Sequence, residues 1–296
     1  MKKYNCMKMS FKSYLQGKEY SNTSIATYER FTNQFLEWTQ KENLPTEQTR
    51  YQDILSYMKH CTGKKNYSQR TVQHMLITLS HYFDYLQETG VINSNPAKGI
   101  KVQGVKRKTL YHILEPSELH AIYNTYEATT PSQKKNKVIT GMLVYQGLKT
   151  EELDRMEIRD VKLKEGKIEI AGSRRSNART LSLEPHQVLD VYEYAMQVRP
   201  QILEKAKQET DKFFVSTEGG DKLRMDFLMK QLRKQNNKIE NGDQLRASVI
   251  VKWLKQYNLR EVQYMAGHRY ISSTEAYKQN EMEGLSEEVN LYHPLG

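Results

Sequence analysis

Three residues near the C-terminal end of the sequence have side chains that together suit the attack of a phenol on a phosphodiester: Arg246, His268 and Tyr277. An arginine neutralises phosphate charge, a histidine donates a hydrogen bond to a phosphate oxygen, and a tyrosine supplies the nucleophile. His268 and Tyr277 lie nine residues apart (277 − 268 = 9), and Arg246 leads an expected helical run over residues 247–256. Each residue alone would be ordinary, since the chain has 20 tyrosines, but the combination predicts phosphodiester chemistry.

The composition indicates a polyanionic partner. Lysine and arginine number 45 against 35 acidic residues, which gives a formal net charge of +10 in a chain of 296 residues. By itself, such a balance predicts only non-specific attraction to a polyanion. No apolar run approaches the roughly 20 residues that a membrane-spanning helix needs, so we expect a cytoplasmic protein. The two cysteines, Cys6 and Cys61, have no metal-ligand or disulfide spacing, and no metal or cofactor is expected.

The first hundred residues have the pattern of short amphipathic helices. Aromatic residues recur at helical spacing from Tyr28 to Trp38, and Ser68 is placed to cap a long helix that Gly90 ends. Asn95-Pro96 breaks the helical pattern, and a stretch without acidic residues follows. We predict that this stretch is a linker along the DNA backbone, and its basic residues are Lys101, Lys106, Arg107 and Lys108. The pattern predicts a helical domain over residues 1–104.

The rest of the chain, residues 105–296, predicts a second domain with one small antiparallel sheet. Glu115-Pro116 is a helix start, and Glu165-Gly166 supplies a turn between strands. The expected strands are residues 161–163, 167–170 and 180–183. The expected later helices are residues 185–198, 201–207, 225–234, 245–256 and 259–266. The fold class is therefore mainly α, with an α+β second domain.

These motifs, in this order, resemble the tyrosine recombinase (phage integrase) family. The resemblance includes Asn95-Pro96-Ala97 before the basic linker, the segment Gly147 to Leu153, the strands after Val161, and Gly267-His268 through Tyr277. It implies a helical core-binding domain, a catalytic domain and cleavage of DNA through a 3′-phosphotyrosine. It also implies a homo- or hetero-tetramer on double-stranded DNA, and Glu152 is similar to the family's supporting acid.

Three positions depart from the family pattern. Lys149 stands where the family has its first catalytic arginine, and Asp243 stands where it usually has a histidine. The family's hairpin lysine falls at Arg174 or Arg175. Because a guanidinium has a pKa above about 12, Arg174 is a poor proton donor to a leaving hydroxyl. Lys162, Lys164 and Lys167 are alternative donors, and Asp243 is either a proton acceptor for Tyr277, an orienting group or a bystander.

The resemblance predicts a site-specific recombinase or integrase, but three other functions remain open. The altered active-site positions would also suit a catalytically impaired DNA-binding accessory protein on the same scaffold. A type IB topoisomerase-like relaxase uses the same Tyr-Arg-His chemistry, although the small N-terminal domain favours a recombinase. A helical transcription regulator is the least favoured, because a protein that only binds DNA needs neither Tyr277 nor His268.

Overall fold

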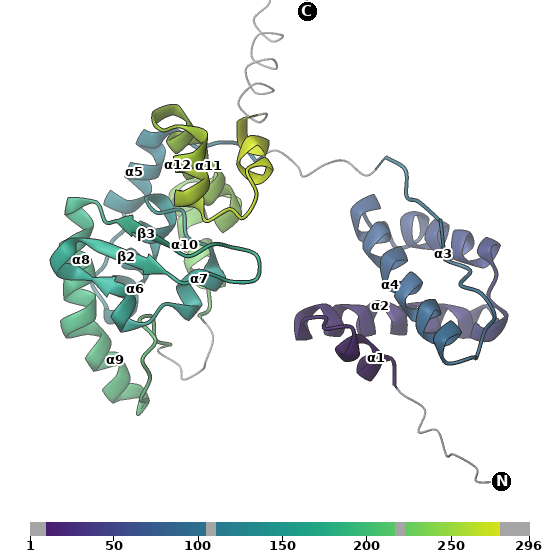
Figure 1. Cartoon of the computed structure of the whole chain (residues 1–296). Coiled ribbons are helices and arrows are strands. Elements are labelled where there is room, and N and C mark those ends of the chain that lie inside the picture. The colour runs from purple at the N-terminus through teal and green to yellow at the C-terminus, as the bar shows by residue number, and fades with distance from the viewer. Residues whose placement is uncertain (1–9, 105–110, 217–222, 279–296) are drawn as a thin grey trace, which may run out of the picture. The chain divides into compact units, whose positions relative to one another are not determined.

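The computed structural model describes residues 10–104, 111–216 and 223–278, and it divides the chain into two compact units, Met1–Thr109 and Leu110–Gly296 (Figure 1). The division falls five residues beyond the boundary expected after residue 104 (109 − 104 = 5). Each unit has its own hydrophobic core. Within the described ranges, no helix is both long enough and apolar enough to span a membrane.

The first unit is helical. Its elements are α1 (Phe11–Gly17), α2 (Asn22–Lys41), the 3₁₀ turn Thr46–Gln48, α3 (Tyr51–Gly63) and α4 (Gln69–Glu88). Serine side chains cap three of these helices: Ser10, Ser21 and Ser68 each accept a hydrogen bond from the backbone N–H three residues on. The predicted cap at Ser68 is therefore confirmed. Phe35 of α2 meets Phe83 of α4 edge to face at 5.8 Å, so the long helices pack through aromatic rings.

The second unit combines helices with one sheet. Its helices are α5 (Pro116–Asn124), α6 (Pro131–Val144), α7 (Thr150–Arg155), α8 (Pro185–Glu193), α9 (Arg199–Ala206), α10 (Asp226–Gln235), α11 (Gly242–Gln256) and α12 (Leu259–Ala266). Short 3₁₀ turns occupy Ile158–Asp160 and Leu163–Glu165, and a π turn at Tyr194–Val198 joins α8 to α9. Residues 272–278 are also helical. The helix α11 is buried on nearly every side from Gln244 to Val251, which makes it the central helix of this unit.

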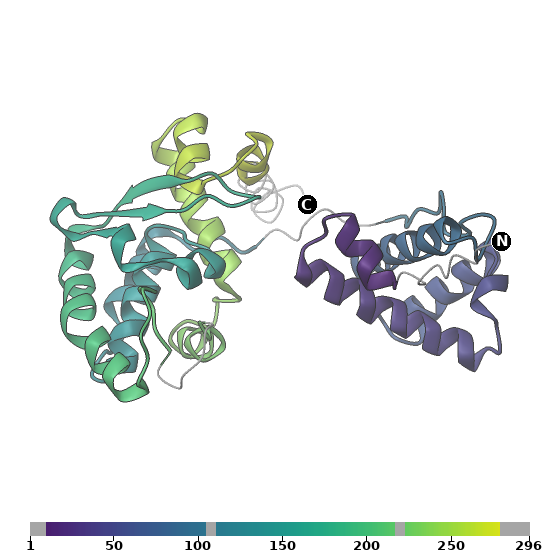
Figure 2. The same cartoon turned by 60° about the horizontal axis from the view of Figure 1, so that its bottom comes forward.

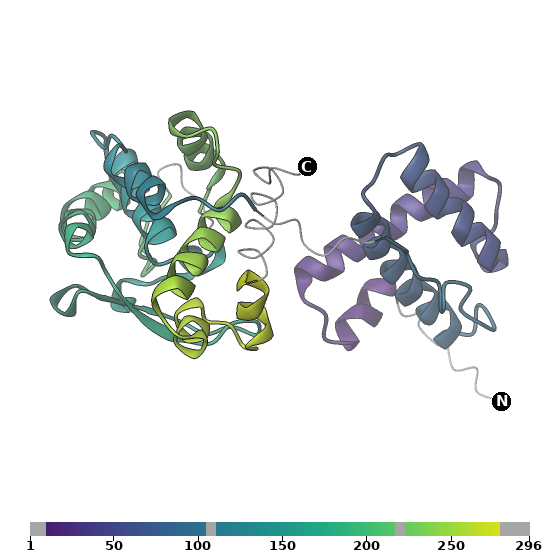
Figure 3. The ribbon, with the colours of Figure 1, turned by 90° about the horizontal axis from the view of Figure 1, so that it is seen from above.

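The sheet is antiparallel, as predicted, in the order β1 (Val161–Lys162), β2 (Lys167–Ile170), β3 (Arg179–Ser182). Its inner face buries Ile168, Ile170 and Leu181. The helix α12 covers the edge strand, where the Tyr264 hydroxyl accepts a hydrogen bond from the Thr180 N–H at 3.0 Å. Figure 2 shows the β2–β3 hairpin extending toward the helix at residues 272–278, and Figure 3 shows the two side by side from above. The sheet therefore carries its hairpin tip to the segment that holds His268 and Tyr277.

Candidate active site

The buried guanidinium of Arg246 joins two helix ends. Arg246 is 3% exposed, and its side chain donates hydrogen bonds to the carbonyl oxygens of Gly147 and Ala266, both at 2.5 Å. Gly147 lies just before α7, whereas Ala266 ends α12. Burial lowers the pKa of Arg246, and the nearby Glu152 carboxylate opposes that shift. Arg246 is thus a fixed positive charge between the N-terminus of α7 and the C-terminus of α12.

Glu152 lies behind this arginine and forms a buried ion pair that the sequence did not reveal. Both of its oxygens accept hydrogen bonds from Arg179, at 2.9 Å each, and one lies 3.9 Å from Arg246 Nη1. The same carboxylate accepts the backbone N–H of Lys149 at 2.9 Å. Burial would raise the pKa of Glu152, but the hydrogen bonds and charge of Arg179 outweigh it and hold that pKa below its ordinary value. Glu152 therefore stays ionised and orients three cationic residues.

His268 lies two residues beyond α12, and two side-chain contacts hold its ring. Its Nδ1 lies 2.9 Å from the Thr274 hydroxyl, and its ring stacks on the Tyr277 ring with 5.8 Å between centroids and 11° between planes. Burial, followed by the charges of Arg246 and Lys149, lowers the pKa of His268 to about 4. The imidazole is therefore neutral at pH 7 and acts as a hydrogen-bonding group.

Gly267 allows this turn to lie directly against the buried ion pair. Its φ of +64° is left-handed, and a Cβ there would lie 2.5 Å from Arg179 Nη1. The Gly267 carbonyl also accepts the Asn177 N–H at 3.0 Å, which attaches the hairpin to the end of α12. Only glycine satisfies both the dihedral angle and the space, so the position of His268 depends on this residue.

A cavity of about 330 Å³ opens in front of these groups. Its eight lining residues are Lys149, Arg174, Arg175, His268, Arg269, Tyr270, Ser273 and Tyr277. Four of the eight are lysine or arginine, so the cavity suits a phosphate group. Lys149, Arg174, Arg175, His268 and Tyr277, which the sequence predicted as site residues, are therefore brought together, with Arg246 and Glu152 buried behind them.

The charges around Tyr277 act in opposite directions. Burial raises the pKa of its phenol, Arg246 lowers it, and Asp243 raises it again. Asp243 is exposed on the first turn of α11. Burial raises the pKa of Tyr111, and the Asp243 carboxylate raises it further. It does not line the cavity. The structure shows an electrostatic effect of Asp243 on Tyr277, which was not among the roles predicted for it.

The linker residues divide between described and undescribed parts of the chain. Lys101 is exposed in the first unit. Lys106, Arg107 and Lys108 lie outside the described residues, so their predicted role along the DNA backbone stays a prediction. Among residues 10–104, 111–216 and 223–278, no three His, Cys, Asp or Glu side chains are grouped so that they could hold a metal ion.

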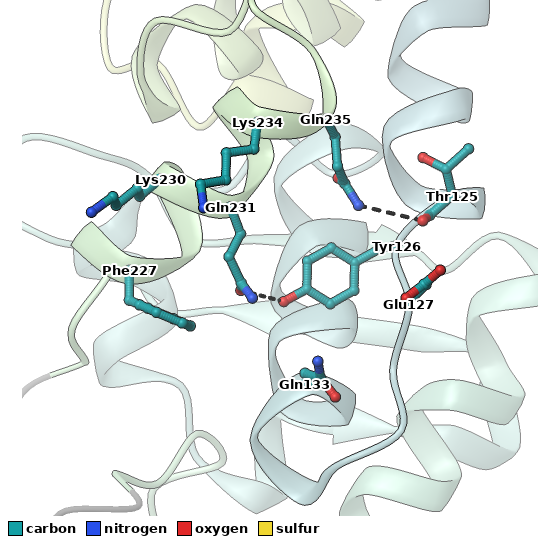
Figure 4. A pocket seen from close by; sticks show the side chains of 9 residues that line it. All are labelled: Thr125, Tyr126, Glu127, Gln133, Phe227, Lys230, Gln231, Lys234 and Gln235. Atoms are coloured by element: carbon teal, nitrogen blue, oxygen red, sulfur yellow. Dashed lines mark hydrogen bonds between the residues drawn. The ribbon is translucent and has the colours of Figure 1, made fainter.

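A larger hollow, of about 520 Å³, lies elsewhere in the second unit between α10 and the segment that joins α5 to α6 (Figure 4). The Tyr126 hydroxyl donates to Gln231 Oε1 at 2.8 Å across it, and Gln235 donates to the Thr125 carbonyl at 3.3 Å. None of the predicted catalytic residues lines this hollow, and it is therefore separate from the candidate active site.

Comparison with known proteins agrees with the fold. The phage integrase family matches residues 112–283, and the N-terminal SAM-like domain of phage integrases matches residues 9–90. The chain belongs to the phage integrase family, the tyrosine recombinases, which confirms the resemblance seen in the sequence.

Individual relatives are distant but cover nearly the whole chain. Tyrosine recombinase XerC of Anoxybacillus flavithermus is 23% identical over 274 residues, 90% of each protein. Tyrosine recombinase XerD of Listeria innocua is 24% identical over 285 residues, 94% of each protein. The crystal structure of XerH site-specific recombinase bound to palindromic difH substrate, a post-cleavage complex, superposes with a TM-score of 0.70. It is 18% identical and covers 90% of this chain and 79% of that one.

Proposed function

We propose that this protein is a site-specific DNA recombinase whose Tyr277 attacks a scissile phosphate and forms a 3′-phosphotyrosine. The observation that carries the proposal is the cavity in which Tyr277, stacked on His268, faces four basic side chains. The phenol oxygen bonds to phosphorus as the bond to the 5′ oxygen breaks. The freed 5′-hydroxyl of a partner strand later attacks the phosphotyrosine. Because that bond conserves the energy of the broken phosphodiester, this chemistry uses no metal ion or nucleotide.

The proposed reaction gives each site residue a physical task. Arg246 is buried and doubly hydrogen-bonded, so it presents a pre-oriented charge to the developing phosphorane. The basic groups Lys149, Arg174 and Arg175 neutralise the remaining phosphate charge. His268, as a neutral imidazole, donates a hydrogen bond to a phosphate oxygen. Glu152 positions Lys149 and Arg246 without contacting DNA.

The proposed partner is duplex DNA, bound by a tetramer that joins two duplexes, which would place the protein at the nucleoid. The net charge of +10 supports phosphate binding that weakens steeply with salt. We expect the tail at residues 284–296, outside the described residues, to pack either on its own protomer or on a neighbour. If it packs on a neighbour, its deletion will preserve binding of the monomer to duplex DNA and abolish cooperative assembly.

The test uses a pool of nicked duplexes with a randomised core, which trap a covalent intermediate because the cleaved strand cannot be rejoined. Wild-type protein should yield protein–DNA adducts that survive a denaturing gel, and sequencing of the trapped DNA should return one recurrent site. Tyr277→Phe should abolish the adduct and keep salt-sensitive binding to that site. Tyr257→Phe, at an exposed tyrosine after α11, is the matched control and should form wild-type amounts of adduct.

Two results would overturn the proposal. Binding without any adduct from wild-type protein would favour the DNA-binding accessory function. Adduct formation with relaxation of supercoiled plasmid but no strand exchange between two copies of the recovered site would favour a topoisomerase.

A further inference from the structure

We propose that Lys149 is the general acid that protonates the leaving 5′ oxygen, and that Arg174 binds the phosphate in its place. This inference rests on the proposed function. Relative to the family pattern, lysine and arginine have exchanged positions between the start of α7 and the tip of the β2–β3 hairpin. The two side chains have exchanged tasks as well. A proton donor is needed because an alkoxide leaves poorly unless an acid supplies a proton.

Most groups in the cavity are unsuited to donate that proton. Arg174, Arg175 and Arg269 carry guanidinium groups, which are not deprotonated in proteins. His268 is buried beside Arg246, and its pKa of about 4 leaves it as a neutral imidazole, which is not an acid at neutral pH. Tyr277 is the nucleophile. Of the eight lining residues, Lys149, Tyr270 and Ser273 remain, and an alcohol such as Ser273 is a far weaker acid than an ammonium group.

The lysines of the sheet, which the sequence left open as donors, lie outside the cavity. Lys162 pairs with Glu169 at 3.6 Å, and Lys167 pairs with Glu165 at 3.8 Å. Lys164 lies exposed in the 3₁₀ turn between β1 and β2. The strand geometry therefore excludes all three from the region of Tyr277 and leaves Lys149 as the lysine of the site.

Lys149 has a fixed backbone and a half-buried side chain. It caps α7, and its N–H is held by the Glu152 carboxylate at 2.9 Å, so the side chain enters the cavity from a rigid position. Burial and the charge of Arg246 lower the pKa of Lys149, with a further contribution from Arg179, and Glu152 and Glu151 oppose them. A lowered pKa brings an ammonium group closer to the operating pH, which makes it a more effective proton donor.

Arg174 is suited to the other task. It lies at the hairpin tip, where its carbonyl oxygen accepts a hydrogen bond from Arg269 Nη1 at 2.8 Å and its side chain is exposed. A guanidinium presents a planar fork that holds two phosphate oxygens and keeps its proton. The hairpin tip, which is attached to the loop after α12, thus supplies a positive charge and donates no proton.

Cleavage moves two protons. The Tyr277 oxygen bonds to phosphorus, and the phenolic proton passes to solvent water. The bond from phosphorus to the 5′ oxygen breaks, and the Lys149 ammonium group transfers one proton to that oxygen, which leaves as a hydroxyl. On rejoining, the neutral Lys149 amine takes a proton from the attacking 5′-hydroxyl and the tyrosine regains its own.

The test compares two forms of the recovered site, one with the natural 5′ oxygen and one with sulfur in its place. Sulfur leaves as a thiolate, whose conjugate acid has a pKa near 8.5, so it needs no general acid. Lys149→Met should lose about 10²–10⁴-fold in adduct formation on the oxygen substrate and cleave the sulfur substrate within about tenfold of wild type. Cleavage of the sulfur substrate also proves that the variant is folded.

Three further variants separate the proton donor from a phosphate ligand. Lys149→Arg keeps the charge but does not release its proton, so it should resemble Lys149→Met on both substrates. The double variant Lys149→Arg/Arg174→Lys should recover oxygen cleavage relative to Lys149→Arg. Lys164→Met removes an exposed lysine outside the cavity and should behave as wild type.

Specific results would overturn the exchange of tasks. Equal losses of Lys149→Met on both substrates, or wild-type oxygen cleavage by Lys149→Arg, would make Lys149 a phosphate ligand. Sulfur rescue of Tyr270→Phe instead of Lys149→Met would assign the acid to Tyr270. Failure of the proposed function itself is distinct, because wild-type protein would then form no adduct with either substrate.

Discussion

The two units of this protein differ in what they bury. In residues 10–104, the buried side chains are apolar or uncharged, with Phe35 and Phe83 fully enclosed. In residues 111–216 and 223–278, five charged side chains are buried: Lys135, Glu152, Arg179, Arg199 and Arg246. Removing an ion from water costs several kcal/mol even after relaxation. The first unit is therefore built for packing, whereas the second gives up stability to hold charge in place.

The five buried charges have two kinds of partner. Lys135 and Arg199 donate to backbone carbonyl oxygens, of Val215 at 3.1 Å and of Lys212 at 2.7 Å respectively, so they anchor the segment after α9. The other three form the cluster behind the candidate active site.

Tryptophan fluorescence distinguishes the two units, because the chain has two tryptophans, Trp38 in the first unit and Trp253 in the second. Single-tryptophan variants therefore follow the unfolding of each unit separately.

The largest expected effect comes from disrupting the buried cluster of Glu152, Arg179 and Arg246. Glu152→Leu leaves Arg179 and Arg246 buried without their anion, so we expect the second unit to lose about 3–5 kcal/mol of stability. Urea unfolding followed at Trp253 measures the change, and the Trp38 transition should stay in place. Glu151→Leu, at the exposed neighbour on α7, should cost about 0.5 kcal/mol. Equal costs for the two variants would mean that the cluster contributes nothing to stability.

The next effect tests the contact between Gly267 and Arg179. Gly267→Ala adds a strained left-handed residue and a Cβ 2.5 Å from Arg179 Nη1, so we expect a loss of about 2–4 kcal/mol at Trp253. Gly166→Ala is the matched control. Its φ is +62°, and a Cβ there meets nothing within 4 Å, so it should cost only about 1 kcal/mol. Similar losses in the two variants would show that backbone strain alone, without the ion pair, fixes the turn before His268.

Much of this architecture follows from local sequence patterns. Helix α12 and strand β2 have the predicted bounds, because each has a clear period and a capping or turn residue at its end. Other boundaries were wrong by a residue or more. The strand expected over 161–163 ends at Lys162, since the Leu163 carbonyl oxygen instead accepts the Gly166 N–H of the turn. The helices expected over 185–198 and 201–207 left residues 199 and 200 between them, but α9 begins at Arg199 directly after a π turn, so the helical path continues through Pro200.

The site was predictable where residue types recur at short spacing and hidden where contacts are long-range. Arg179 lies 27 residues from Glu152, so no local pattern links them. One signal was available, because Arg179 and the buried Leu181 lie two residues apart along β3 and therefore share its inward face. Asp243 shows the opposite limit: its position in the sequence indicated an active-site role, and only the structure shows that it is exposed outside the cavity.

The smallest expected effect is on the pH dependence of stability, which we compare for one histidine of each unit. Burial lowers the pKa of both His268 and His81, the former to about 4. As the pH falls from about 6.5 toward 4, His268 takes up a proton in the unfolded chain but stays neutral in the folded protein. Stability is therefore lost over that range. His268→Asn should remove about 1–2 kcal/mol of this acid loss at Trp253, since solvent screening reduces the full value, and leave Trp38 unchanged. His81→Asn should act only at Trp38, and an effect of either variant at both tryptophans would show that the two units unfold together.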